Sequence, residues 1–274
     1  RPLRPLTMAR VLITGGTTGI GQAVLRQLID VGHEVISTSR NPQPEDASVN
    51  WFTLDLSHPD SVQAFCESSC WDKPIDAVFN NAGFGLIAPI ESASTEAIRQ
   101  QFEANYFGTI AITQKAMEHF RQHNRGVLMV NTSIGGRMAF PYFGYYNATK
   151  HALEASYESL WYECRESNIR IKIIEPGFTQ TNFATHGMQI SGETSPYHSK
   201  GLSWLAKSMQ EGTTATPPND VAKVIVRALF DQTSTLRYHA GKHSGALLLM
   251  RKLLPDSWFH ALISKAVLRG QESN

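Results

Sequence analysis

A glycine-rich turn after the first apolar run restricts the possible folds of this chain more than any other feature. The run Val11–Thr14 is short and rich in β-branched residues, and positions 14–21 then read Thr-Gly-Gly-Thr-Thr-Gly-Ile-Gly. Ile20–Asp30 carries apolar residues at helical spacing and is followed by Gly32, a typical residue at a helix C-terminus. A strand, a glycine turn and a helix in this order bring backbone N–H groups and a helix N-terminus close to a pyrophosphate. An ordinary glycine-rich turn is the alternative, but the position directly after the first strand favours dinucleotide binding.

Strand-like and helix-like segments continue to alternate along the chain. Further strands are predicted over Glu34–Thr38, Trp51–Leu54, Ala77–Phe79, Val127–Asn131, Ile169–Ile174 and Leu236–Ala240. Further helices are predicted over Pro59–Ser68, Thr95–Asn105, Thr109–Gln122, Tyr145–Ser167, Asp220–Phe230 and, broken by Pro255, Ala246–Leu268. Alternation with continuously apolar strands predicts an α/β fold: a single-domain Rossmann fold with a doubly wound parallel sheet of about seven strands and helices on both faces.

One domain is expected, because an α/β fold of 274 residues needs no second core. Residues 1–8 form an N-terminal extension in this interpretation, and residues 9–274 form the domain. Residues 178–217 are rich in threonine, serine and glycine and interrupt the regular pattern, so we expect a substrate lid there. Residues 241–274 are expected to be a C-terminal helical extension.

Composition excludes several classes of function. The 25 Lys and Arg against 24 Asp and Glu give a net charge of +1, which lacks the basic footprint of a nucleic-acid-binding protein. The three cysteines are too few for a disulfide scaffold, and no second pair or nearby histidine completes a zinc site, so no metal is expected. No apolar run approaches the roughly 20 residues of a membrane span, and we see no secretory signal. A cytoplasmic protein is therefore expected.

The end of the second predicted strand indicates which dinucleotide binds. NAD-binding folds usually place an acid there, but this chain reads Ser37-Thr38-Ser39-Arg40. The planar guanidinium of Arg40 could pair with a 2′-phosphate, which favours NADP(H); a solvated surface arginine is the alternative. Asp55, after the third strand, could accept a hydrogen bond from the adenine amino group, or could be an ordinary turn aspartate.

Two further motifs are candidates for catalysis. Tyr146 and Lys150 lie four residues apart and therefore share a helix face. A phenol has a pKa near 10, and a neighbouring ammonium group lowers it, so the pair could exchange a proton with a substrate oxygen. The adjacent Tyr145 is followed four residues later by Thr149, which makes it the weaker candidate. Ser133 follows the fifth strand and could hold a substrate carbonyl, or could be a simple turn serine.

Together these motifs resemble the short-chain dehydrogenase/reductase family, from Ala9 to about Ala240. The matched positions are Thr14, Gly15, Gly19 and Gly21 for its glycine motif, Asn80, Asn81, Ala82 and Gly83 for its Asn-Asn-Ala-Gly motif, Asn105 for its catalytic asparagine, Ser133, Tyr146 and Lys150 for the rest of its catalytic tetrad, and Pro176, Gly177 and Thr181 after the sixth strand. No catalytic position departs from the family pattern.

The resemblance implies a role for each matched residue. Tyr146 would be the general acid in reduction, Lys150 would lower its pKa and bind the nicotinamide ribose, Ser133 would orient the substrate oxygen, and Asn105 would hold a water in a proton relay. The positions expected to contact the cofactor are Gly15, Thr17, Gly19, Ile20, Gly21, Arg40, Asp55, Leu56, Asn81, Ala82, Gly83, Tyr146, Lys150, Pro176, Gly177, Thr179 and Thr181.

The expected substrate pocket is apolar and partly aromatic. Its candidate residues are Phe84, Met138, Phe140, Tyr142, Phe143, Phe178 and Phe183, although some could simply pack the lid onto the core. His186 and His198 could bind a polar substrate end or could be solvated. The pattern is similar to the branch containing 17β-hydroxysteroid and retinol dehydrogenases, which implies a hydrophobic ketone, aldehyde or secondary alcohol and a homodimer or homotetramer. A cofactor-binding sensor, or non-redox epimerase or cyclase chemistry, is the alternative function.

Overall fold

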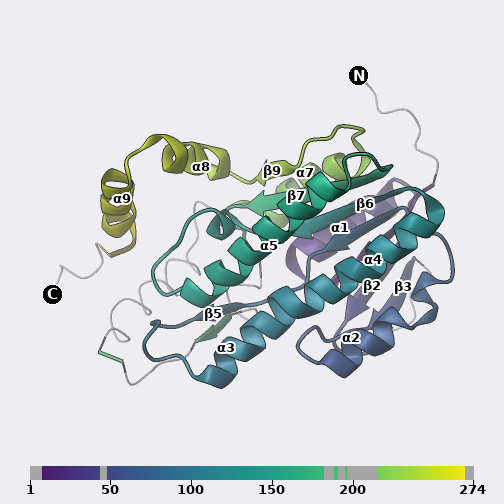
Figure 1. The fold of residues 1–274 in the computed structure, drawn as a ribbon, viewed down its shortest axis with the longest axis horizontal. Coiled ribbons are helices and arrows are strands. Elements are labelled where there is room, and N and C mark those ends of the chain that lie inside the picture. The colour runs from purple at the N-terminus through teal and green to yellow at the C-terminus, as the bar shows by residue number, and fades with distance from the viewer. Residues whose placement is uncertain (1–7, 44–47, 182–187, 191–194, 197–214, 269–274) are drawn as a thin grey trace.

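Seven short apolar strands pair in parallel, in the order β3-β2-β1-β4-β6-β7-β9, in a computed structural model that describes residues 8–43, 48–181, 188–190, 195–196 and 215–268 (Figure 1). The strands are β1 (Arg10–Ile13), β2 (Glu34–Ser39), β3 (Val49–Thr53), β4 (Ala77–Asn80), β6 (Gly126–Asn131), β7 (Ile169–Pro176) and β9 (Arg237–Ala240). The predicted single-domain Rossmann fold is confirmed. The strand order reverses between β1 and β4, and open α/β sheets bind ligands at such a point.

Helices cover both faces of this sheet. One face carries α1 (Gly19–Asp30) and α7 (Pro218–Phe230), and the other carries α2 (Pro59–Cys66), α4 (Thr109–His123) and α5 (Gly144–Glu163). The helix α3 (Thr95–Phe102) precedes α4, and two short 3-10 turns are η1 (Ser69–Trp71) and η3 (Ile134–Gly136).

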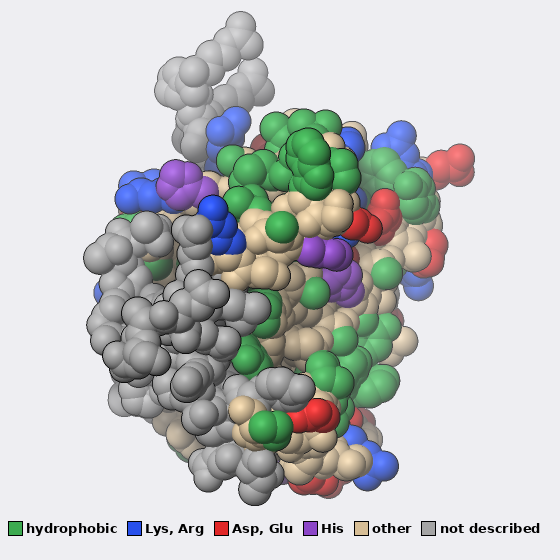
Figure 2. Space-filling model, turned by 90° about the vertical axis from the view of Figure 1, so that its left-hand side faces the viewer, with side chains coloured by type: hydrophobic (Ala, Val, Ile, Leu, Met, Phe, Trp, Pro, Cys, Tyr) green, Lys and Arg blue, Asp and Glu red, His purple; other side chains and the backbone are tan. Residues whose placement is uncertain are grey.

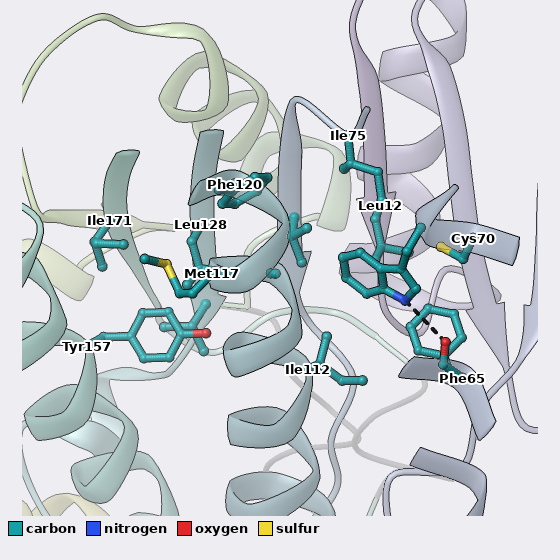
Figure 3. Close-up of a cluster of buried hydrophobic side chains, with 14 of the residues drawn as sticks. Leu12, Phe65, Cys70, Ile75, Ile112, Met117, Phe120, Leu128, Tyr157 and Ile171 are labelled. Atoms are coloured by element: carbon teal, nitrogen blue, oxygen red, sulfur yellow. Dashed lines mark hydrogen bonds between the residues drawn. The ribbon is translucent and has the colours of Figure 1, made fainter. Parts of the chain in front are cut away.

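Strand side chains alternate between two buried clusters, as a pleated sheet requires. Leu12, Leu128 and Ile171 point toward α4 and α5, where Phe120 and Tyr157 complete the packing (Figure 3). The neighbouring strand residues face the opposite cluster, which α1 and α7 cover; they are Val11, Ile13, Val127 and Met129. Because helices bury both faces of the sheet, a ligand is expected at the carboxyl ends of its strands.

The two helices predicted on either side of residue 107 are joined by a π-helical turn, η2 (Glu103–Gly108). A Cβ on Gly108 would lie 2.6 Å from the backbone oxygen of Leu56, so only glycine permits this close approach. The turn carries Asn105, and π-helical turns are frequent at functional sites.

A small second sheet was not predicted. It pairs β5 (Gly85–Ile87) with β8 (Met188–Ile190) in parallel. The two ends of the predicted lid also meet, because Thr179 forms a bridge with Thr216 and the backbone N–H of Thr216 donates to the oxygen of Phe178 at 2.9 Å. Most of the lid between them lies outside the described residues.

The C-terminal arm, residues 244–268, consists of α8 (Ser244–Leu253) and α9 (Asp256–Leu268), separated at Pro255 as expected. Phe259 is buried with Ile134 and Met138, which docks the arm beside η3. Among its described side chains, the arm exposes the large apolar residues Leu249, Met250, Leu253, Trp258 and Leu262. Figure 2 shows hydrophobic side chains gathered where α8 and α9 lie. Across the described ranges, none of the helices combines the length and the hydropathy that a membrane crossing requires.

Candidate active site

The glycine turn after β1 has a backbone that other residues cannot adopt without strain. Gly15 and Gly19 have φ values of +71° and +59°, in the left-handed region that favours glycine. A Cβ on Gly21 would lie 2.2 Å from the oxygen of Gly15 and 2.6 Å from Nδ2 of Asn81. The missing side chains therefore keep the turn tight and its backbone open to a ligand.

The N-terminus of α1 is free to bind an anion. The side chain of its N-cap residue, Thr18, makes no capping hydrogen bond, and the first turn contains no acid. Unpaired N–H groups and the helix dipole attract negative charge at such an end. Ala82 lies beside Gly15, and Thr181 lies beside Gly19, where a Cβ would approach within 3.0 and 3.2 Å respectively. These contacts bring the segments after β1, β4 and β7 together, and the resulting cradle fits a dinucleotide.

Hydrogen bonds tie this cradle to the sheet. Thr14 Oγ1 accepts from the backbone N–H groups of Asn81 at 2.9 Å and Ala82 at 3.0 Å. Asn81 Nδ2 donates to the oxygens of Thr14 and Gly15, at 3.1 and 3.2 Å, and its Oδ1 accepts from Asn131 Nδ2 at 3.0 Å. No role is predicted for Asn131 from the sequence, although its place at the end of a predicted strand, two residues before Ser133, is a signal for one.

Arg40 and Asp55 lie near each other at the ends of β2 and β3. Arg40 is exposed, and Asp55 Oδ1 accepts from the backbone N–H of Ser57 at 2.9 Å and from its hydroxyl at 2.6 Å. Burial raises the pKa of Asp55, but the Ser57 hydrogen bonds and the charges of His58 and Arg40 outweigh it, so the pKa lies below its usual value. Asp55 thus makes the hydrogen bonds of an ordinary turn aspartate, and its contact with the adenine amino group stays a prediction.

Ser133, Tyr146 and Lys150 come together at the carboxyl end of β6. Ser133 Oγ accepts from the backbone N–H of Gly135 at 3.0 Å at the start of η3, and Ser133 also hydrogen-bonds to the Tyr146 hydroxyl. Lys150 lies one helical turn after Tyr146 on α5, with its Nζ 5.7 Å from the centroid of the tyrosine ring. Lys150 Nζ donates to the backbone oxygen of Asn131 at 2.8 Å. The three predicted catalytic groups therefore share one small volume.

The pKa of Tyr146 is not lowered, contrary to the expectation for a tyrosine beside a lysine. Burial raises the pKa of Tyr146 to about 12, and the hydrogen bond with Ser133 acts in the opposite direction. Burial also lowers the pKa of Lys150 to about 8, against the charge of Glu154, which raises it. Desolvation disfavours the charged form of both groups, and it outweighs their neighbours.

Asn105 projects from η2 onto the loop after β4. Its Nδ2 donates to the backbone oxygen of Phe84 at 2.8 Å, and its Oδ1 accepts from the N–H of the same residue at 3.0 Å. Nδ2 also donates to Thr149 Oγ1, next to Lys150, at 3.3 Å. Asn105 therefore fixes the Phe84 backbone beside the tetrad, and its proposed contact with a relay water stays a prediction.

The cofactor positions after β7 form a continuous segment beside β9. The backbone N–H of Gly177 donates to the oxygen of Ala240 at 2.9 Å, and Thr179 Oγ1 donates to the oxygen of Gly177 at 3.1 Å. Pro176 is the last residue of β7, and its Cα pairs with that of Ala240. Of the remaining cofactor positions, Ile20 packs against the core cluster of α1 and Leu56 is buried.

The predicted substrate residues lie in different surroundings. The ring centroid of Phe143 lies 6.1 Å from that of Tyr146, and the ring centroids of Phe140 and Phe178 lie 5.9 Å apart. Met138 is 2% exposed and packs against the C-terminal arm. Phe84 is held by Asn105, as described, whereas Phe183 lies outside the described residues, as do His186 and His198.

An open surface hollow is lined by Pro89, Ile90, Glu91 and Tyr142, and Tyr142 packs in the same apolar cluster as Tyr146. Tyr142 has a φ of +66°, which is uncommon for a bulky residue and often marks a functional segment. Its backbone oxygen accepts from the N–H of Ala88 at 2.9 Å, which holds the strained turn in place.

Comparison with known proteins shows the family and the fold of the chain. Residues 9–189 match the family of short chain dehydrogenases. The chain is 28% identical over 251 residues to a 3-ketodihydrosphingosine reductase of Bacteroides thetaiotaomicron. The aligned region covers 90% of this chain and 93% of that protein. A short-chain dehydrogenase structure from Streptomyces avermitilis superposes with a TM-score of 0.81 and 25% identity, covering 97% of this chain and 99% of the other. One from Burkholderia cenocepacia, in complex with NADP, superposes with a TM-score of 0.76 and 19% identity, covering 95% and 99%.

The family match spans the glycine turn, the Asn81 cradle and the Ser133–Tyr146–Lys150 group that the geometry brings together. The chain belongs to the short-chain dehydrogenase family of oxidoreductases.

Proposed function

We propose that the protein is an NADP(H)-dependent oxidoreductase that acts on a hydrophobic ketone or aldehyde, or on the corresponding alcohol. The observation that carries this proposal is the convergence of Ser133, Tyr146 and Lys150 at the edge of the sheet where the glycine turn opens. The carboxyl ends of the strands then hold both a group that could donate a proton and a cradle that fits a dinucleotide.

The residues that would hold the cofactor are those of the cradle. The N-terminus of α1 and the turn from Gly15 to Gly21 would bind the pyrophosphate, and Lys150 would bind the nicotinamide ribose. When bound, the nicotinamide supplies or accepts the hydride. The absence of an acid at the end of β2, together with the exposed guanidinium of Arg40, supports NADP(H) over NAD(H).

The chain itself would move the proton. Tyr146 would donate its hydroxyl proton to the substrate oxygen during reduction, and Ser133 would orient that oxygen. A tyrosine with a pKa of about 12 holds its proton firmly at neutral pH, so it needs a cation beside it to release one. Lys150 is the group placed to provide that charge, since its Nζ lies 5.7 Å from the tyrosine ring.

An apolar substrate agrees with the surroundings of the tetrad, since Phe143, Ile87 and Phe140 pack around Tyr146. The resemblance to 17β-hydroxysteroid and retinol dehydrogenases and the name of the similar 3-ketodihydrosphingosine reductase both support a hydrophobic carbonyl substrate. A cytoplasmic homodimer or homotetramer, pairing through α3, α4 and α5, completes the proposal.

The test is the oxidation of NADPH by the purified protein, followed by absorbance, with a panel of steroid, retinoid, quinone and long-chain ketones. We expect Tyr146→Phe to lower turnover by about 100-fold or more, because a positioned acid contributes on that order. Tyr145→Phe is the matched control: its hydroxyl donates to the backbone oxygen of Ile90 at 2.7 Å, away from Lys150, so turnover is expected to persist. Full turnover in Tyr146→Phe would overturn the proposal. Product formed without net consumption of NADPH would instead indicate epimerase or cyclase chemistry.

A further inference from the structure

A buried carboxylate lies one helical turn beyond the lysine of the tetrad. Glu154 is on α5, four residues after Lys150, so the two side chains share a helix face. The Glu154 side chain is 6% exposed and packs against Gly136, where a Cβ would lie 3.0 Å from the Cγ of Glu154. Burying an ionised carboxylate costs much free energy unless other groups hold its charge.

Two donors hold the charge of Glu154 from separate elements. Thr132 Oγ1, after β6, donates to Oε1 at 2.6 Å, and Arg237 Nε, on β9, donates to Oε2 at 2.9 Å. Both partners accompany an ionised carboxylate, because a hydroxyl and a guanidinium each donate a proton to it. Glu154 is therefore fixed in position rather than free to rotate.

Further charged groups face Glu154 from the neighbouring elements. Glu175, on β7, lies 3.5 Å from Arg237 Nε and 3.4 Å from Arg137. Arg137, after η3, lies 4.0 Å from Glu154. Glu158, on α5, accepts from Arg237 at 2.9 Å, and His239 Nδ1, on β9, lies 2.6 Å from Glu175 Oε2. Arg137, Arg237 and, when it is protonated, His239 face these three carboxylates, so Glu154 belongs to a network of opposite charges.

Lys150 is buried one helical turn before Glu154 on α5, outside this network of ion pairs. Its Nζ donates to the neutral backbone oxygen of Asn131, and its titratable neighbours on the same helix face are Tyr146 on one side and Glu154 on the other. We propose that Glu154 is a positioning residue that keeps the Lys150 amine protonated and directed at the active site. The inference rests on the proposed function, in which a charged Lys150 assists Tyr146.

The titration behaviour of both groups supports this reading. Burial lowers the pKa of Lys150, and the negative charge of Glu154 opposes that fall. Burial, together with the charge of Glu175, raises the pKa of Glu154 above its usual value, although the hydrogen bonds from Thr132 and Arg237 act in the opposite direction. Glu154 thus acts on Lys150 through its charge, while its two oxygens accept from Thr132 and Arg237.

The direct test is an NMR titration of the lysine side-chain amines in the intact protein, with the Lys150 signal assigned by its loss in Lys150→Arg. Glu154→Gln removes the charge but keeps an acceptor for Thr132. We expect the pKa of Lys150 to fall by about 1 unit in this variant, the lower end of the effect of a nearby opposite charge. Glu154→Met, an apolar replacement of similar length, is a second variant and is expected to give the same shift.

Glu158→Gln is the matched control. Glu158 also bonds to Arg237, but it lies a further turn along α5 and its side chain is 43% exposed. The pKa of Lys150 is expected to stay unchanged in this variant, and Glu154→Asp, which keeps the charge, is expected to restore most of the wild-type value. An unchanged pKa in folded Glu154→Gln and Glu154→Met would overturn the proposal.

Activity provides a separate readout. The decline of kcat at high pH, as Lys150 loses its proton, is expected to move to lower pH in Glu154→Gln by the same amount as the NMR titration. A shifted NMR titration with no turnover in any variant, wild type included, would overturn the proposed function and leave the role of Glu154 intact. A shifted titration with an unmoved kcat profile would show that catalysis does not depend on the charge of Lys150, and would overturn the active-site part of the inference.

Discussion

Lys150 Nζ donates to the backbone oxygen of Asn131 at 2.8 Å, and this bond joins α5 to the end of β6. The lysine is buried, yet the partner it reaches is a neutral carbonyl. Asn131 in turn donates to Asn81 in the cradle at 3.0 Å. The proton-transfer group and the nucleotide cradle are thus parts of one hydrogen-bonded unit.

Burial of Lys150 predicts a characteristic dependence of stability on pH. Its pKa of about 8 in the folded protein lies below the usual lysine value of 10.5, so the unfolded chain binds more protons between these two pH values. The lysine therefore lowers stability at neutral pH, and this cost disappears as the pH rises from about 8 to 10.5. Wild type is expected to gain about 3 kcal/mol of free energy of unfolding as the pH rises through that window. Lys150→Met has no amine to titrate and lacks this gain, so the stability of the variant relative to wild type falls by the same amount. Urea unfolding of both proteins at several pH values measures it, and a constant difference would contradict the pKa assignment.

A substitution in the glycine turn is expected to weaken cofactor binding through steric overlap alone, because Gly21 is not among the residues with positive φ. In Gly21→Ala the new Cβ would lie 2.2 Å from the oxygen of Gly15, so the turn must move. We expect NADPH affinity, measured by cofactor fluorescence, to fall by about 10-fold or more, because overpacking costs of order 1–3 kcal/mol. Gly32→Ala is the control: Gly32 has a φ of +86° and open space around it, so this variant is expected to lose stability but to keep its affinity. Equal affinities in both variants would refute the assignment of the turn.

Arg40 predicts the preference between the two nicotinamide cofactors. We expect Arg40→Asp to weaken NADPH binding by about 10- to 100-fold and NADH binding much less, because a charge-assisted hydrogen bond contributes about 1.5–3 kcal/mol. Calorimetric titration with both cofactors measures the ratio. Arg99→Asp, at another exposed arginine on α3, controls for the change of net charge. Equal losses for NADPH and NADH in Arg40→Asp would rule out the phosphate contact.

Local sequence patterns predict most strands of the sheet, but they predict few of the pKa shifts. Each central strand is a β-branched apolar run, and each is confirmed within a few residues. The strands β5 and β8 escape prediction because they have three residues each and pair across about a hundred positions. The π-helical turn depends on the approach of Leu56 to Gly108, which no local pattern encodes.

Tertiary burial explains the two remaining differences. In a sequence, a glutamate within a helix is expected to be solvent-exposed. The burial of Glu154 depends on the packing of β6, β7 and β9 around α5, which local sequence does not predict. The motif Tyr-x-x-x-Lys indicates that Tyr146 and Lys150 are adjacent, and the structure agrees. The direction of the pKa shift, however, depends on how much water the fold excludes, which spacing does not reveal.

The bridge between Thr179 and Thr216 closes the predicted lid segment at its base. The two ends of the segment therefore lie together beside the sheet, and its described residues 188–190 return to the domain where β8 pairs with β5. Substrate range can therefore diverge during evolution by insertion, deletion or recombination above the anchor, while the catalytic and nucleotide-binding framework is inherited unchanged.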